Sequence, residues 1–213
     1  MAAEASGVKL IQPDPSLESF TVWCDMDTRG GGWAVIDSFA LANKAGRGNF
    51  YGTNLALDGN EFSWDNFRLR QSRMLAVLQA SDQFHVRCNT TLESSQSDFM
   101  FGNLATAAGF NMLTRATSAY NLLTTTTNPH DIDGKIRGYS TTQYDYLFWH
   151  GRWQAHVNSY HVGIPHRVHD EQNFGYYNHQ NPAHACTASP EAITVWMLRA
   201  NLHPPPPSPP PPA

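Results

Sequence analysis

The stretch WCDMDTRGGGWAVI, residues 23–36, holds two strand-like segments separated by a run of glycines. Just before and within it, Phe20, Val22 and Cys24 recur at every second position, which is typical of a strand with one buried face. The glycine triplet permits a tight reversal, because glycine adopts backbone angles that other residues avoid. Residues 33–36 then predict the returning strand. The stretch therefore predicts a β-hairpin.

Further strands and one helix are predicted outside this hairpin. In residues 84–88 (FHVRC) the apolar positions and the cysteine fall on one side of a strand, and residues 193–198 (ITVWML) form the last strong strand candidate. A helix is predicted over residues 64–78, whose apolar positions suit one helical face: Phe67, Met74, Leu75 and Leu78. These patterns favour a β-rich domain.

Composition narrows the classes of function. The chain has 213 residues, of which 41% are hydrophobic and 15% charged, and its formal net charge is −4. Without a basic stripe, a nucleic-acid partner or an anionic membrane surface is disfavoured. The longest apolar run, residues 74–78, is far shorter than the roughly 20 residues of a spanning helix, so no membrane insertion is expected. No signal peptide is visible in MAAEASGVKL.

The chain divides into three parts in this interpretation. Residues 1–18 are an N-terminal extension, residues 19–201 the folded domain, and residues 202–213 a proline-rich spacer. The spacer contains PPPPSPPPP, which has no backbone donors and favours a polyproline II rod of roughly 28 Å. A stiff linker is the favoured role, since no flanking Arg or Lys marks a ligand for a proline-binding module.

The hairpin stretch resembles the opening of the fibrinogen C-terminal-like domain superfamily, which includes the intelectin-like lectins. Its Cys24-Asp25-Met26 and Gly31-Gly32-Trp33 blocks carry the resemblance, and residues 191–199 (EAITVWMLR) are similar to the final strand of that superfamily. The resemblance implies an α+β fold centred on an antiparallel sheet, with long loops that form a calcium site and a ligand pocket. It also implies an extracellular module that binds acetylated sugars, other glycans or protein ends.

The cysteines depart from the family pattern. The cysteine that would pair with Cys24 is missing, since residues 1–23 contain none, and Cys186 has no partner shortly before it. Two pairings stay open: Cys24 with Cys88, or Cys186 with an upstream cysteine. The third thiol is then free or forms an intermolecular disulfide. Beside Cys88, Asn89-Thr90-Thr91 is an N-glycosylation acceptor if the chain is secreted.

Residues 170–175 (DEQNFG) resemble the calcium loop of fibrinogen-like domains. Asp170 and Gln172 would supply side-chain oxygens and Phe174 its carbonyl oxygen, a donor set that suits a hard cation. Gln172 stands where an acid is expected, which removes charge from the site. The alternative interpretation is a polar surface loop.

Residues 176–186 (YYNHQNPAHAC) are similar to the family segment that leads to a cysteine at the ligand pocket. Tyr176, Tyr177 and His184 would offer stacking faces and hydrogen bonds to a sugar or acetyl group. Alternatively the tyrosines pack on the sheet. Seven of the ten histidines lie between residues 150 and 184, which raises a transition-metal site as a further hypothesis, although no HExxH motif occurs.

Binding is favoured over catalysis. The sequence has no GxSxG elbow, P-loop or GxGxxG motif. The leading hypothesis is an extracellular or cell-surface recognition module for glycans or extracellular glycoproteins, with calcium as its cofactor. The alternative is a structural matrix or surface-filament glycoprotein that self-associates. The tail supports this alternative, because it resembles the serine-polyproline blocks of hydroxyproline-rich glycoproteins in green algal walls.

Overall fold

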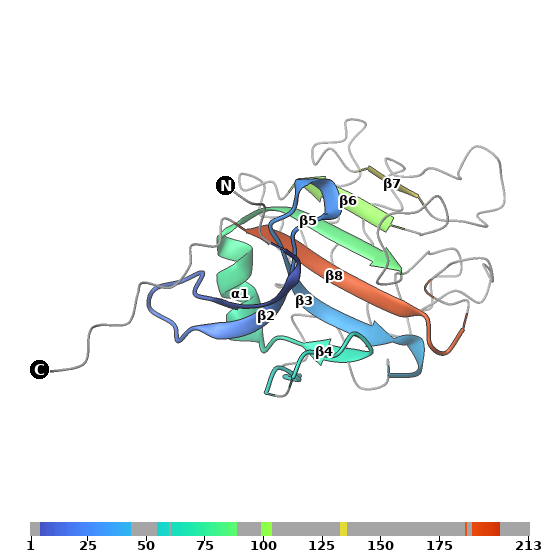
Figure 1. Ribbon diagram of the computed structural model, residues 1–213, viewed down its shortest axis with the longest axis horizontal. Helices are drawn as coiled ribbons and strands as arrows, with labels where there is room; N and C mark the ends of the chain where they lie inside the picture. Colours follow the sequence, from blue (N-terminus) through green and yellow to red (C-terminus); the bar gives the residue numbers. More distant parts are fainter. Residues whose placement is uncertain are drawn as a thin grey trace, which may run out of the picture.

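The described part of the chain is an antiparallel sheet with one α-helix against it (Figure 1). The computed structural model describes residues 5–43, 55–59, 61–88, 99–103, 133–135, 186 and 189–200. Within these residues eight strands pair in the order β1-β2-β3-β8-β5-β6-β7, and β4 pairs with β3 beside that path. The elements are β1 Gly7–Ile11, β2 Phe20–Asp25, η1 Thr28–Gly30, β3 Trp33–Ala40, η2 Leu41–Asn43, β4 Asn66–Arg68, α1 Gln71–Gln79, β5 Ser81–Cys88, β6 Phe99–Asn103, β7 Asp133–Lys135 and β8 Ile193–Ala200.

The predicted hairpin is confirmed. β2 and β3 are antiparallel and joined by the 3-10 turn η1, with Asp25 opposite Trp33. Phe20, Val22 and Cys24 are buried, as the period-two pattern predicts. β3 is longer than predicted, and all eight of its residues are buried, because it lies between β2 and β8 in the middle of the sheet.

β1 lies in the segment that the sequence analysis assigned to an N-terminal extension. It pairs with β2 over its whole length, from Gly7 opposite Cys24 to Ile11 opposite Phe20, and Ile11 joins the core. The extension therefore supplies an edge strand of the sheet. The apolar residues of this strand do not mark a buried face, because the side chains of Val8 and Leu10 are each 51% exposed.

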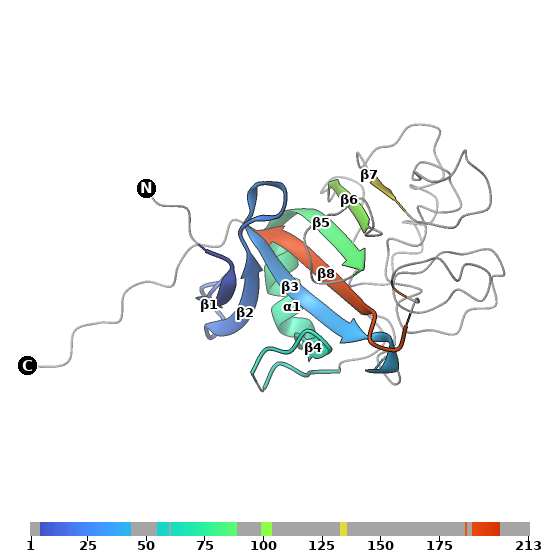
Figure 2. The same ribbon diagram turned by 45° about the vertical axis from the view of Figure 1, so that its right-hand side comes forward.

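β8 comes from the C-terminal part of the chain but pairs with strands from its first half, β3 and β5. The predicted strand at residues 193–198 is confirmed and continues to Ala200, between β3 and β5. Arg199 lies opposite Trp33 on one side and Gln83 on the other. The two stretches that carry the family resemblance are thus adjacent strands of one sheet, which Figures 1 and 2 both show.

The helix prediction over residues 64–78 is wrong in its first half. The helix begins at Gln71, whereas Asn66–Arg68 forms β4, opposite Asp37, Ser38 and Phe39 of β3. A tertiary contact overrides the local pattern, because the Arg68 guanidinium lies 3.7 Å from the carboxylate of Asp37 and both side chains are buried. In α1 itself, Met74 and Val77 are buried within the core. Figure 2 shows α1 across one face of the sheet, behind β3.

Candidate functional site

The residues predicted to bind ligand lie outside the described residues. These are the pocket residues Tyr176, Tyr177 and His184, the calcium ligands Asp170, Gln172 and Phe174, and the glycosylation site Asn89. The histidine-rich segment at 150–184 and the proline-rich spacer at 202–213 lie outside them as well. Their roles remain predictions. What the structure supplies is the scaffold to which these segments are attached.

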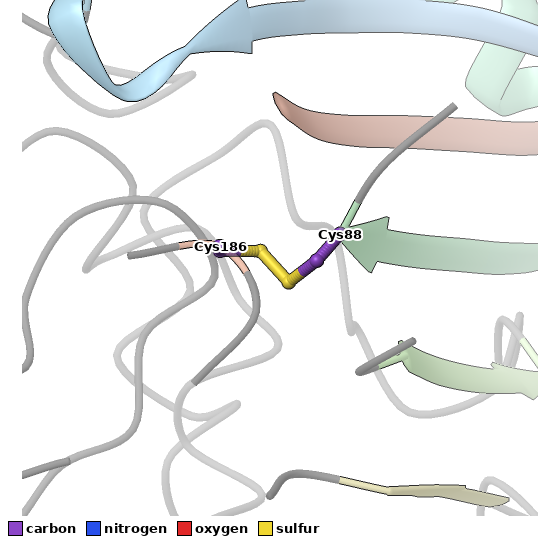
Figure 3. The surroundings of a disulfide bond; sticks show 2 residues. All are labelled: Cys88 and Cys186. Carbon is purple, nitrogen blue, oxygen red and sulfur yellow. A yellow bond between two sulfur atoms is a disulfide. The ribbon is translucent and has the colours of Figure 1, made fainter. Parts of the chain in front are cut away.

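One disulfide attaches the predicted pocket segment to the sheet. Cys88, the last residue of β5, is bonded to Cys186, with 4.8 Å between their Cα atoms (Figure 3). Of the two pairings that the sequence left open, the structure therefore has the one that joins Cys186 to an upstream cysteine. Cys24 takes no part in this bond and is buried in β2 with 5% of its surface exposed. An intermolecular disulfide through Cys24 would require β2 to leave the sheet.

The disulfide lies at the end of the sheet where strand β5 ends and strand β8 begins. Cys88 is opposite Thr194 in the ladder, and all three residues, Cys88, Thr194 and Cys186, have no exposed surface. In the sequence His184 precedes Cys186 by two residues, and Asn89 directly follows Cys88. The crosslink thus fixes the end of the predicted pocket segment and the start of the predicted glycosylation sequon to one place on a rigid sheet.

A buried polar network lies around η1 and includes Arg87, the residue before Cys88 in β5. The Asp25 carboxylate accepts hydrogen bonds from the Asp27 N–H (3.0 Å) and from the Thr28 N–H (2.9 Å) and hydroxyl (2.7 Å). It also lies 3.1 Å from the Arg87 guanidinium, which donates a second hydrogen bond to the Thr28 hydroxyl oxygen. The Trp33 indole N–H donates to the Thr28 carbonyl at 2.7 Å. This network connects β2, η1, β3 and β5.

The network keeps Asp25 ionised inside the protein. Burial alone raises the pKa of the Asp25 carboxyl, because a charge is less stable away from water. The hydrogen bonds from Thr28 and Asp27, together with the charge of Arg87, outweigh that effect and hold the pKa below its usual value. A buried carboxylate with this many donors is a structural group, since its oxygens are held by Asp27 and Thr28 of the turn and by Arg87 of β5.

His85 lies beside this network on β5 and is neutral. Burial, followed by the charges of Arg87 and Arg29, lowers the pKa of His85 to about 3. Its ring packs 5.5 Å from the Trp33 ring and 6.1 Å from the Phe99 ring, and the Arg29 guanidinium lies 5.3 Å from the centre of Phe99. At neutral pH His85 is therefore uncharged and acts as a packed ring.

The glycine triplet is required by geometry at one position above all. Gly31 has φ +78° and a Cβ atom there would lie 2.5 Å from the Met26 carbonyl oxygen. Arg29 adopts the left-handed conformation as well, with φ 46°. Arg199 lies alongside, where it donates to the Gln83 side chain at 3.0 Å. Glycine at 31 thus allows the close approach of backbone that the buried network needs.

The polar face of β5 is buried, contrary to what the sequence pattern predicts. His85 and Arg87 occupy the alternate positions between Phe84, Val86 and Cys88, which a simple alternation assigns to solvent, yet both are buried. The sequence did contain a clue: Asp25 and Thr28 of the hairpin are possible partners for a buried Arg87. Within the described residues no group of three or more His, Cys, Asp or Glu side chains could hold a metal ion. Nor does that part of the chain contain a helix long and apolar enough to cross a bilayer.

Comparisons with known proteins agree with the sequence resemblance. Residues 1–56 match the family model for the C-terminal globular domain of fibrinogen beta and gamma chains. Among solved structures, the fibrinogen-like globe domain of human ANGPTL2 is 17% identical, with 94% of each chain covered and a TM-score of 0.40. The corresponding domain of human ANGPTL6 is 15% identical, covers 93% of this chain and 90% of its own, and has a TM-score of 0.36. The family match includes the whole hairpin stretch and confirms the resemblance there.

Proposed function

We propose that this chain, whose first 56 residues match fibrinogen C-terminal domains, is an extracellular recognition module that binds glycans or a protein ligand without catalysis. Tyr176, Tyr177 and His184 form the ligand pocket in this proposal. Calcium is held nearby by the side chains of Asp170 and Gln172 and the carbonyl of Phe174. Acetylated sugars are the favoured ligand class, because an acetyl group offers an apolar methyl for stacking and a carbonyl for hydrogen bonding.

The observation that carries this proposal is the Cys88–Cys186 disulfide. Structural disulfides persist in oxidising compartments and are rare in the cytosol, which favours a secreted or cell-surface protein. The bond also ties the segment before Cys186 to the end of β5. Binding residues on a loop that is fixed to a rigid sheet lose less conformational entropy when ligand binds.

The test is a glycan array probed with the whole protein, with calcium and with a calcium chelator. We expect binding to acetylated glycans that the chelator abolishes. Asp170→Asn should weaken this binding, while Asp82→Asn, the same change at an exposed position of β5, should leave it unaltered. The paired change Tyr176→Ala and Tyr177→Ala should abolish binding in the presence of calcium.

Two results would count against the proposal in separate ways. Binding that persists in chelator and in Asp170→Asn would remove calcium from the site but keep the recognition module. No binding to any glycan or extracellular protein in the presence of calcium would remove the recognition function itself.

A structural assembly role is the second candidate, and one observation favours it. β1 is the edge strand of the described sheet, and its Val8 and Leu10 side chains are each 51% exposed. Exposed apolar edge strands pair readily with other chains. Sizing with light scattering separates the roles: ordered multimers that Val8→Lys and Leu10→Lys dissociate, without any glycan binding, support assembly.

A further inference from the structure

Three partly buried aromatic side chains form a cluster near the N-terminal edge of the sheet, here called the aromatic patch: Trp23, Phe62 and Trp64. The Trp23 ring stacks on Phe62 at 5.4 Å, and Trp64 meets Trp23 and Phe62 edge-on at 5.1 and 4.8 Å. The three rings therefore form one continuous aromatic surface. All three side chains keep part of their surface exposed.

The patch faces away from α1. In β2, Trp23 points to the opposite side from Phe20, because successive side chains of a strand alternate between faces. Phe20 lies on the helix side, since its ring packs 4.8 Å from the guanidinium of Arg73 in α1. On the patch side, Val8 is opposite Trp23 in the β1–β2 ladder and is 51% exposed, so it extends the apolar surface.

A segment suited to such an aromatic surface is present in the same sequence. Residues 204–212, PPPPSPPPP, carry no charge and favour the polyproline II conformation. Aromatic-lined grooves recognise this conformation, because it is already ordered and the proline rings pack flat against aromatic faces. We propose that residues 204–212 dock on the aromatic patch of their own chain.

The end of β8, where the described chain stops, lies close to the patch. Arg199 and Asp25 both lie opposite Trp33, so the end of β8 is two strand spacings, about 10 Å, from the end of β2. Trp23 lies two residues back along β2, about 7 Å further. Figures 1 and 2 both show β8 ending on the side of the sheet where β2 lies.

Chain length agrees with this separation and favours an intramolecular contact. Ala200 is about 14 Å from Trp23 by the strand spacings above, whereas the seven residues from Ala200 to Pro207 span up to about 25 Å when extended, so the middle of the tail reaches the patch. A short covalent link gives the tail an effective concentration on the order of millimolar at the patch. The same segment on a second copy is far more dilute. This inference does not depend on the glycan or calcium proposal.

The test compares the whole protein with a full-length variant in which the prolines at 204–207 and 209–212 are serine. Indole N–H signals are recorded by NMR with ¹⁵N-tryptophan, together with their broadening by a soluble paramagnetic agent. We expect the signals of Trp23 and Trp64 to shift and to broaden more strongly in the serine variant. The signal of Trp33 is the internal control, because its indole is buried and bonded to the Thr28 carbonyl.

A second variant tests the contact from the other side. Trp64→Leu should release the tail, so that the methyl signal of Ala213 becomes as narrow as in the serine variant. Unchanged Trp23 and Trp64 signals, or an Ala213 signal that Trp64→Leu does not affect, would overturn the proposal and leave the tail as a free spacer. A difference that disappears on dilution would also overturn it, since the tail would then come from a second copy.

Discussion

Replacing Arg87 with methionine should destabilise the protein strongly, because Arg87 is the cation of a buried ion pair. The Arg87 and Asp25 side chains are only 3% and 6% exposed, and their charged groups are 3.1 Å apart. Methionine keeps much of the apolar stem but leaves the Asp25 carboxylate buried without its cation. Removal of one partner from a buried pair costs about 3–5 kcal/mol of unfolding free energy. Urea unfolding at pH 7, followed by tryptophan fluorescence, measures this loss.

The matched control is Arg70→Met. Arg70 also lies near a carboxylate, 3.3 Å from Asp58, but its side chain is 47% exposed and Arg73 remains 2.7 Å from the same carboxylate. An exposed pair is worth about 0–1 kcal/mol, so this variant should be nearly as stable as the original protein.

Acid should reduce the difference in unfolding free energy between the Arg87→Met variant and the original protein. In the original protein the pKa of Asp25 is lower in the folded than in the unfolded state, so its contribution is present at neutral pH and is lost as pH falls below about 3.8. In Arg87→Met the Asp25 pKa rises, and protonation relieves the buried charge at a higher pH.

Two results would refute the reasoning. The first is a loss below about 1 kcal/mol for Arg87→Met, which would place the pair in the range of exposed ion pairs. The second is additivity in the cycle of Asp25→Asn, Arg87→Met and the double variant, since contacting residues should couple.

Three further predictions follow from single contacts. Gly31→Ala should lower the unfolding free energy by roughly 2 kcal/mol or more in the same urea assay, since its φ is +78° and its Cβ would lie 2.5 Å from a carbonyl oxygen. The control Gly59→Ala should change the unfolding free energy little, because no atom lies within 4 Å of the added Cβ. Replacing both Cys88 and Cys186 by serine should cost roughly 4 kcal/mol, because the bond closes a loop of 98 residues; an unchanged midpoint of thermal unfolding would contradict this. The ring signals of His85 should not titrate between pH 5 and 8, since its pKa is about 3, and its contribution to stability should fall as pH drops below 6.5, where the unfolded chain binds a proton that the folded chain does not.

The sequence alone determined the local elements whose pattern carries enough information. The period-two alternation at Phe20, Val22 and Cys24 predicted β2, and the glycines predicted the reversal into β3, because the left-handed angles at Gly31 belong to glycine whatever surrounds it. The final strand was also predicted locally, from residues 193–198, which are apolar apart from Thr194.

Only the tertiary structure decided which of these elements meet. Residues 66–68 became a strand instead of a helix because β3 offers them hydrogen bonds and Asp37 pairs with Arg68. Cys88 and Cys186 are 98 positions apart, and no local pattern relates them. Arg87 likewise looked like a solvent-facing residue until the fold placed it against Asp25, 62 residues earlier in the chain. Local sequence sets backbone preference, whereas the partners of a buried charge or thiol depend on contacts between distant segments.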